Sequence, residues 1–213
     1  MNKKGFFITG TDTNVGKTFF SSILIQKFNY DYWKPIQTGK NLENDTLHIE
    51  KNTKTIKNRF HKPIYSFIKP LSPHLASNYE KKSINMKKIK KPNSKIPMII
   101  EGAGGILVPL NKNNLIIDLI KKFKFPVIVV SKSILGTINH TLMTLEILKK
   151  NNIKVFGVVL NNIKNRKEGN DNAKSIEMFG KIKVLAKIPS IKNINKKKTD
   201  NLSKRTFMNI FKI

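Results

Sequence analysis

The stretch that decides the fold is Gly10-Thr-Asp-Thr-Asn-Val-Gly-Lys-Thr18, which follows the apolar run Phe6-Phe-Ile8. A Gly-Lys-Thr ending between a buried strand and a helix is the signature of a phosphate-binding loop. Gly16 lets the backbone approach the phosphates, and the N–H groups at the start of the helix form an anion-binding nest. Lys17 can reach the β- and γ-phosphates, and the hydroxyl of Thr18 can bind Mg²⁺. The stretch therefore predicts a protein that uses ATP.

The loop departs in one place from the strict phosphate-binding pattern. That pattern has a glycine five residues before Gly16, where this chain has Thr11, and the glycine stands one place earlier at Gly10. A glycine-rich turn without a ligand is the alternative interpretation. The position of Gly-Lys-Thr between a strand and a helix favours a variant phosphate loop.

The rest of the chain alternates short apolar runs with longer amphipathic segments, which is typical of strand–helix units that feed a parallel sheet. The expected strands lie near Gly5–Thr9, Tyr30–Lys34, Met98–Glu101, Val127–Ser131, Ile153–Leu160 and Lys183–Lys187. The expected helices lie at Lys17–Phe28, Leu115–Phe123, Ile138–Asn151 and Ala173–Phe179, with another within Asp45–Thr53. A loop is expected through Lys69–His74, and the lysine-rich tail after Ile191 is interpreted as peripheral.

These segments predict an α/β protein. We expect a three-layer P-loop NTPase fold, with a mostly parallel central sheet and helices on both faces. The chain has 213 residues, which is long enough for one sizeable core, and its composition does not divide it into two halves. Residues 1–213 are therefore expected to form a single P-loop domain.

The net charge of +28, from 41 basic and 13 acidic residues, would suit a polyanionic partner. However, almost all of the basic residues are lysines, and the arginines are Arg59, Arg166 and Arg205. Dedicated nucleic-acid binders usually rely on the bidentate fork of arginine. We favour a solvated lysine surface over a polyanion site, and expect no specific nucleic-acid partner.

Cysteine is absent, which excludes disulfides and thiolate metal sites. The N-terminal apolar stretch is short and runs directly into the glycine loop, so we interpret it as a strand and not as a signal peptide. No run approaches the roughly 20 apolar residues needed to span a bilayer. We expect a cytoplasmic protein without a membrane partner.

Two further motifs lie at expected strand ends. Glu101-Gly-Ala-Gly-Gly105 follows one apolar run, and Trp33-Lys-Pro-Ile-Gln-Thr-Gly39 follows another. The carboxyl ends of parallel strands meet at one crevice, so both motifs should face the phosphate loop. Glu101 is therefore a candidate Mg²⁺ ligand, and Lys34 can neutralise a second anion near the γ-phosphate. The alternatives are that the glycines only turn the chain and that Lys34 is an ordinary surface lysine.

Together these motifs resemble the dethiobiotin synthetases, the ATP-dependent enzymes that close the ureido ring in biotin synthesis. The segments that carry the resemblance occur in the family's order: Gly10–Thr18, Lys34-Pro-Ile-Gln-Thr-Gly39, Ser72-Pro-His74, Glu101–Gly105 with Val108-Pro-Leu110, Leu135-Gly-Thr-Ile-Asn-His140 and Val158-Val-Leu-Asn-Asn162. The resemblance runs from the N-terminus to about Pro189.

The resemblance implies 7,8-diaminopelargonic acid, CO₂ and ATP as reactants, with Mg²⁺ as cofactor. One amine takes up CO₂ as a carbamate, the carbamate attacks the γ-phosphate, and the second amine closes the ring and expels phosphate. Because carbamate and triphosphate are both anions, the site needs concentrated positive charge, which Lys17, Lys34 and Mg²⁺ would supply.

The resemblance also implies roles for single residues. Lys17, Lys34 and Thr11 are expected to act on the reacting groups. The expected metal ligands are Thr18, Asp45 and Glu101, although an aspartate in a loop can also be a turn or cap residue. The expected ATP contacts are Asp12, Thr13, Asn14, Val15, Gly16, Lys17, Thr18, Glu101, Gly102, Gly104, Asn161 and Asn162. Asn161 is expected to read the base with its side-chain amide. The expected diamine contacts are Thr38, Ser72, Pro73, Gly136, Thr137, Ile138 and Asn139.

A homodimer is implied as well. In the family, the substrate carboxylate is met by a helix N-terminus of the second subunit, and Gly136-Thr-Ile-Asn139 stands at such a helix start. The alternative is that Leu135-Gly136 only turns the chain into the helix, with Thr137 or Asn139 as its cap.

Two other classes of protein are the rival interpretations. A regulatory ATPase that acts on DNA or membrane usually has a lysine early in its loop, where this chain has Thr11-Asp-Thr13. An amide-forming ligase would carry a glutaminase domain with a nucleophilic cysteine, which this chain lacks.

Overall fold

The computed structural model describes residues 4–42 and 44–206. Its centre is a seven-stranded sheet in the order β4-β2-β6-β1-β7-β8-β9, in which neighbouring strands are parallel. The strands are β1 (Gly5–Gly10), β2 (Asp31–Trp33), β4 (Phe60–His61), β6 (Met98–Gly105), β7 (Val127–Lys132), β8 (Val155–Ile163) and β9 (Val184–Pro189). A separate two-stranded sheet pairs β3 (Ile36–Gln37) with β5 (Tyr65–Ser66). Because β1 lies between β6 and β7, the loop that follows it opens at the middle of the sheet's carboxyl edge.

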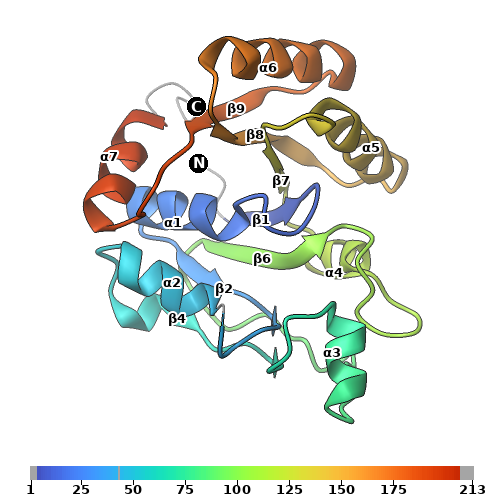
Figure 1. Ribbon diagram of the computed structural model, residues 1–213. Helices are drawn as coiled ribbons and strands as arrows, with labels where there is room; N and C mark the ends of the chain where they lie inside the picture. The colour runs from blue at the N-terminus through green and yellow to red at the C-terminus, as the bar shows by residue number, and fades with distance from the viewer. Residues whose placement is uncertain (1–3, 43, 207–213) are drawn as a thin grey trace.

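Helices cover both faces of the sheet (Figure 1). The helices α1 (Lys17–Phe28), α2 (Asp45–Asn52) and α7 (Lys196–Thr206) pack in the hydrophobic cluster on one face. The helices α3 (Pro73–Tyr79), α4 (Ile116–Phe123), α5 (Thr137–Lys150) and α6 (Arg166–Gly180) pack in the cluster on the other. A short 3-10 helix, η1 (Lys57–Arg59), precedes β4. The expected three-layer α/β fold with a parallel sheet is confirmed.

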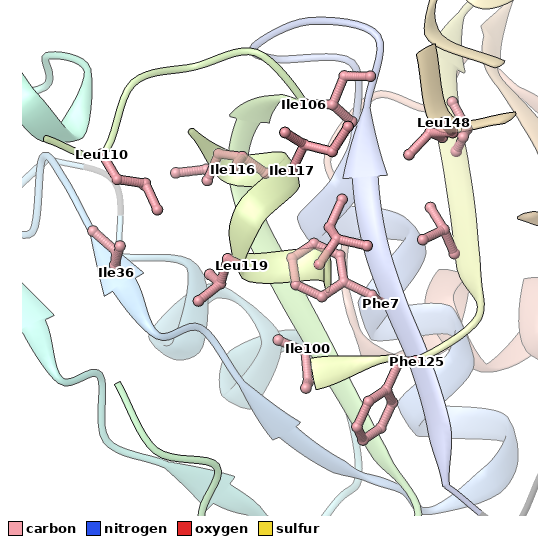
Figure 2. Packing of buried hydrophobic residues seen from close by; sticks show 14 of the residues in the cluster. Phe7, Ile36, Ile100, Ile106, Leu110, Ile116, Ile117, Leu119, Phe125 and Leu148 are labelled. Atoms are coloured by element: carbon pink, nitrogen blue, oxygen red, sulfur yellow. The ribbon is translucent and has the colours of Figure 1, made fainter. Parts of the chain in front are cut away.

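The alternation of side chains along the strands explains the two clusters. Successive residues of a strand point to opposite faces of the sheet. Phe6 and Ile8 of β1 therefore pack with α1, whereas Phe7 between them packs with the helices opposite. Figure 2 shows Phe7 in this cluster, with its strand partner Ile100 of β6 and with Ile117 of α4 among the other members. Strands covered on both faces need apolar residues at every position, which is why they appear in the sequence as continuous apolar runs.

The expected strands and helices are all present, with some ends displaced. The expected strand at 98–101 continues through the glycines to Gly105. The helix expected from Ala173 starts at Arg166, because the side chain of Asn165 accepts the backbone N–H groups of Lys167 and Glu168 and caps it there. A polar first turn hid this start from the apolar pattern.

One correction concerns the loop expected through residues 69–74. Helix α3 begins at Pro73, so only the residues before it form a loop. Proline suits the first helical position because its φ is already fixed and its missing N–H would have no partner within the helix. The region 40–96 also contains β4 and β5, which were not expected, since strands of two residues carry no readable alternation.

The other correction concerns the tail after Ile191, which is not peripheral. Helix α7 lies alongside α1 (Figure 1) and buries Thr199 and Ser203. Asp200 of α7 accepts a hydrogen bond from Gln26 of α1 at 3.2 Å. The low apolar content of α7 concealed this contact, because the buried residues of the helix are the polar Thr199 and Ser203, and Leu202 packs on the cluster while only partly buried. Residues 207–213 of the tail lie outside the described residues.

Candidate active site

The phosphate loop and the two strand-end motifs open into one crevice with a volume of about 800 Å³. Its lining includes Lys17 and Thr18 from the loop, Lys34 after β2, Asp45 at the start of α2 and Glu101 of β6. Since β2, β6 and β1 are neighbours in the sheet, their carboxyl ends bring these side chains together.

A residue of β8 holds the phosphate loop against the sheet. The backbone of the loop is left-handed at Asn14 (φ 55°) and at Gly16 (φ 100°). A Cβ atom at Gly16 would lie 1.9 Å from Nδ2 of Asn161, so glycine is required there. The same Nδ2 atom donates to the carbonyl oxygen of Val15 at 2.9 Å. Asn161 therefore fastens the loop to the sheet.

Lys17 is buried beneath the loop, where its Nζ donates to the carbonyl oxygen of Asp12 at 2.9 Å. Burial, together with the positive charge of Lys34, lowers the pKa of Lys17 to about 8. A bound anion would favour the charged form of this lysine and reverse the shift. The loop is thus arranged for a strongly anionic ligand.

Two carboxylates and a hydroxyl converge beside the loop. The hydroxyl of Thr18 donates to Oδ1 of Asp45 at 2.5 Å and lies 2.8 Å from Oε1 of Glu101. Asp45 is the first residue of α2, which is capped by the side chain of Asn44. The side chain of Gln37, which the sequence did not single out, accepts the backbone N–H of Asp45 at 3.3 Å.

Lys34 joins the two carboxylates. Its Nζ forms a short ion pair with Asp45 and lies 3.3 Å from Oε1 of Glu101. Burial alone would lower the pKa of Lys34, but the attraction of Glu101 and Asp45 outweighs burial and raises it. The pKa of Asp45, which burial alone would raise, is lowered by Lys34. Lys34 is therefore a buried charged group and not an ordinary surface lysine.

Two residues that hold Glu101 were not identified from the sequence. The hydroxyls of Ser21 and Tyr32 donate to Oε2 of Glu101 at 3.0 and 3.1 Å. Burial, and then the charge of Glu101, raise the pKa of Tyr32 well above its ordinary value, which keeps the hydroxyl protonated and donating. The sequence signal for Ser21 was its position three residues after Thr18, on the same helix face.

The donor set of this cluster fits Mg²⁺. The part of the chain that the structure describes has no group of three His, Cys, Asp or Glu side chains able to hold a metal ion. Mg²⁺ at nucleotide sites usually needs only one or two carboxylates, with water and phosphate oxygens as its other ligands. Thr18, Asp45 and Glu101 supply oxygen donors of that kind and number.

The other expected contact residues divide between the crevice and its surroundings. Those that line the crevice are Thr13, Asn14, Gly16, Thr38, Ser72, Pro73 and Gly104. Gly102 faces the core, where a Cβ would meet the ring of Phe7 at 3.1 Å. Val15 is buried, and the Asp12 side chain accepts the N–H of Thr13 at 2.6 Å, so both shape the loop itself.

A smaller hollow of about 250 Å³ adjoins the loop on the side of β8. The residues that line it are Asn14, Gly16, Phe19, Lys132, Asn161, Asn162, Pro189, Ile191 and Ile194. Ile194 lines the main crevice too. The chain after Ile191 therefore forms part of the wall, which the interpretation of the tail as peripheral had excluded.

Residues 136–139 lie at the start of α5 and do not line the crevice of their own chain. The buried hydroxyl of Thr137 lies 2.7 Å from that of Ser131, which in turn lies 3.4 Å from the hydroxyl of Thr11. Leu135, just before the helix, is fully exposed. The start of α5 is thus linked to the phosphate loop through the hydroxyl of Ser131, and Leu135 beside it is exposed to solvent.

Comparisons with known proteins identify the family. A family model described as an AAA domain matches residues 4–198. The ATP-dependent dethiobiotin synthetase BioD of Lawsonia intracellularis is 45% identical over 197 residues, which cover 92% of this chain and 93% of that protein. The enzyme of the same name from Paramagnetospirillum magneticum is 44% identical over 185 residues, 87% of each chain. The chain belongs to the dethiobiotin synthetase family.

Membership among the dethiobiotin synthetases confirms the resemblance that the motifs indicated, and with it an ATP-dependent ligase. Among solved structures, a ParA family ATPase from Chlorobium tepidum TLS superposes with a TM-score of 0.55 at 11% identity, covering 96% of this chain and 99% of that one. At that identity the likeness shows the P-loop fold alone. Within residues 4–42 and 44–206, no helix combines the length and the apolar character that crossing a membrane requires.

Proposed function

We propose that this dethiobiotin synthetase closes the ureido ring in the crevice, with Lys17 and Lys34 as its cationic groups and Thr18, Asp45 and Glu101 as its Mg²⁺ ligands. The reactants are 7,8-diaminopelargonic acid, CO₂ and ATP, and the products are dethiobiotin, ADP and phosphate. The observation that carries the proposal is the burial of two lysine ammonium groups around one space of about 800 Å³. Such a site can hold a carbamate and a triphosphate in contact, which would otherwise repel each other.

The chain's own residues bind and orient the two anions. The N–H groups of the loop and the Nζ of Lys17 hold the β- and γ-phosphates. Mg²⁺, when bound at the cluster, neutralises charge on the phosphate oxygens. Lys34, which lines the crevice, faces the carbamate, whose oxygen must lie in line with the γ-phosphorus. Thr11, which was expected to act there too, does not line the crevice and directs its hydroxyl to Ser131 at 3.4 Å. Thr38, Ser72 and Pro73, on the crevice wall, border the diamine.

The nucleotide base is proposed to occupy the hollow beside β8. Phe19, Pro189 and Ile194 offer it apolar surfaces, and Asn161 and Asn162 offer polar groups. Because Nδ2 of Asn161 is bonded to Val15, Asn161 is expected to meet the base through Oδ1.

We further propose a homodimer, in which residues 136–139 of one subunit bind the substrate carboxylate in the crevice of the other. The support is their position at the start of a 14-residue helix, outside their own crevice and beside the exposed Leu135. Mixing two inactive variants, Lys17→Met and Thr137→Pro, tests this arrangement. Shared sites predict that the mixture regains activity, whereas self-contained sites predict none. We also expect the reaction in the cytoplasm, where ATP is available, which cell fractionation tests.

The anhydride route is tested with ¹⁸O-labelled bicarbonate. The carbamate oxygen that attacks the γ-phosphorus leaves with the phosphate when the ring closes. One labelled oxygen is therefore expected in the phosphate product, measured by mass spectrometry after a single turnover. Unlabelled phosphate accompanied by labelled dethiobiotin would exclude the carbamic–phosphoric anhydride.

A further inference from the structure

Glu101 uses its two carboxylate oxygens for different neighbours. Oε2 accepts hydrogen bonds from Ser21 at 3.0 Å and from Tyr32 at 3.1 Å. Oε1 lies 2.8 Å from the hydroxyl of Thr18 and 3.3 Å from Nζ of Lys34. One oxygen is thus bound to the protein interior, and the other faces the groups that line the crevice.

The place of Tyr32 follows from the strand register. Strands β2 and β6 are parallel, and Tyr32 lies opposite Ile99. Tyr32 and its partner Ile99 point to the same face of the sheet, and Glu101, two residues after Ile99 on β6, points there too. Both side chains therefore face α1. A long side chain can reach its diagonal neighbour two residues along the adjacent strand. The ring packs edge-on against Phe60, with 6.3 Å between centroids, which fixes the direction of the hydroxyl.

Ser21 approaches the same oxygen from the helix. It follows Thr18 by three residues, so both side chains emerge from the face of α1 that is turned to β6. Ser21 and Tyr32 are both 0% exposed, and Glu101 is 1% exposed. Hydrogen bonds in so dry a place strongly restrict the side chain that accepts them.

We propose that Tyr32 and Ser21 are positioning residues for Glu101, holding its carboxylate so that Oε1 is presented to the metal ion beside Thr18. This inference rests on the Mg²⁺ site of the proposed function. Neither hydroxyl lines the crevice, so each acts through Glu101 and not on the substrates. Loss of either should therefore weaken metal binding and leave metal-free nucleotide binding intact.

The test uses Tyr32→Phe and Ser21→Ala, each with a matched control. Tyr30→Phe makes the same change at a neighbouring tyrosine that stacks on Phe28. Ser22→Ala makes the same change at a serine whose hydroxyl donates to the carbonyl oxygen of Phe19. Mn²⁺ binding to the ADP complex is measured by electron paramagnetic resonance, and ADP binding without metal is measured by calorimetry.

The Kd for Mn²⁺ is expected to rise about tenfold in Tyr32→Phe and in Ser21→Ala, and further in the double variant. Metal-free ADP affinity should stay at the level of the unsubstituted protein, and both controls should bind Mn²⁺ normally. Activity lost in the two variants should return in part at high Mg²⁺. If Tyr32→Phe does not fold, Ser21→Ala still tests the same oxygen of Glu101 from another element.

An unchanged Mn²⁺ Kd in Tyr32→Phe and Ser21→Ala would overturn the inference. Equal losses of Mn²⁺ affinity and of metal-free ADP affinity would overturn it too, since they would show that the hydroxyls only support the fold. If the unsubstituted protein with ADP bound Mn²⁺ no better than free ADP does, the proposed metal site itself would be wrong, which is a distinguishable result.

Discussion

Lys34 and Glu101 form a buried ion pair, with Nζ of the lysine 3.3 Å from Oε1 of the glutamate and both side chains almost inaccessible to solvent. Asp45 shares the same ammonium group. Without a metal ion, Lys34 is therefore the cation that allows two carboxylates to lie side by side. Removing one member of a buried pair leaves the other charged and uncompensated, which is costly.

Lys34→Met is expected to reduce the free energy of unfolding by about 3–5 kcal/mol and to abolish turnover. Added Mg²⁺ should recover part of that stability, because a divalent cation between Asp45 and Glu101 replaces the lost charge. Urea unfolding with and without Mg²⁺ measures both effects, and Lys40→Met at the exposed rim is the control. A variant as stable as the control, or one indifferent to Mg²⁺, would contradict the ion-pair interpretation.

Lys17→Met is expected to stabilise the nucleotide-free protein although it removes activity. The pKa of Lys17 is about 8 in the folded protein and 10.5 for an ordinary lysine, so the unfolded chain binds the proton more tightly. Lys17 therefore destabilises the folded protein to its full extent below pH 8, and this effect fades as the pH rises from 8 toward 10.5, the pKa of the lysine in the unfolded chain. The free energy of unfolding of the variant should be about 1–3 kcal/mol higher at pH 7, and this difference should shrink above pH 8. Urea unfolding across this pH range measures it, and a pH-independent effect would disagree with the shifted pKa.

Asn161→Ala is expected to raise the KM for ATP about tenfold, because the loop loses its bond from Asn161 to Val15. Gly16→Ala should raise the KM for ATP further, since its Cβ would lie 1.9 Å from Nδ2 of Asn161 and its φ is positive. The double variant relieves the collision but not the backbone strain. The two effects should therefore be less than additive in a double-mutant cycle, and full additivity would count against this contact.

The tail is expected to serve stability and binding through different residues. Leu202 of α7 packs against the hydrophobic cluster that contains α1. Leu202→Ala should therefore lower the free energy of unfolding by about 1 kcal/mol and leave the KM for ATP unchanged. Ile194 lines both the crevice and the smaller hollow beside β8, so Ile194→Ala should raise the KM for ATP. Thermal unfolding and initial rates separate the two. A KM for ATP that changes in Leu202→Ala but not in Ile194→Ala would show that Ile194 does not line the nucleotide site.

The sequence revealed the site where one local segment contains the chemistry. Residues 10–18 predicted the loop by their spacing, and Glu101 and Lys34 followed because strand ends of a parallel sheet share one edge. Tyr32 and Ser21 could not be found in this way. Their contact with Glu101 depends on the register of β2 against β6 and on how α1 crosses the sheet, and neither is written in any single segment.

The same reason explains the misjudged tail. An amphipathic pattern reports the apolar face of a helix, whereas α7 places Leu202 on the apolar cluster and otherwise docks with Thr199, Ser203 and the Gln26–Asp200 hydrogen bond. Small polar side chains pack closely without an apolar signal. Apolar faces are therefore visible in the sequence, whereas a helix that buries mainly small polar residues is not.

The assignment as a dethiobiotin synthetase is tested most directly by a turnover assay. Purified protein is incubated with MgATP, bicarbonate and 7,8-diaminopelargonic acid, and dethiobiotin and ADP are quantified by mass spectrometry. The two products are expected in equal amounts, and neither should form with Lys17→Met. ADP without dethiobiotin, or no product above a control without enzyme, would contradict the assignment.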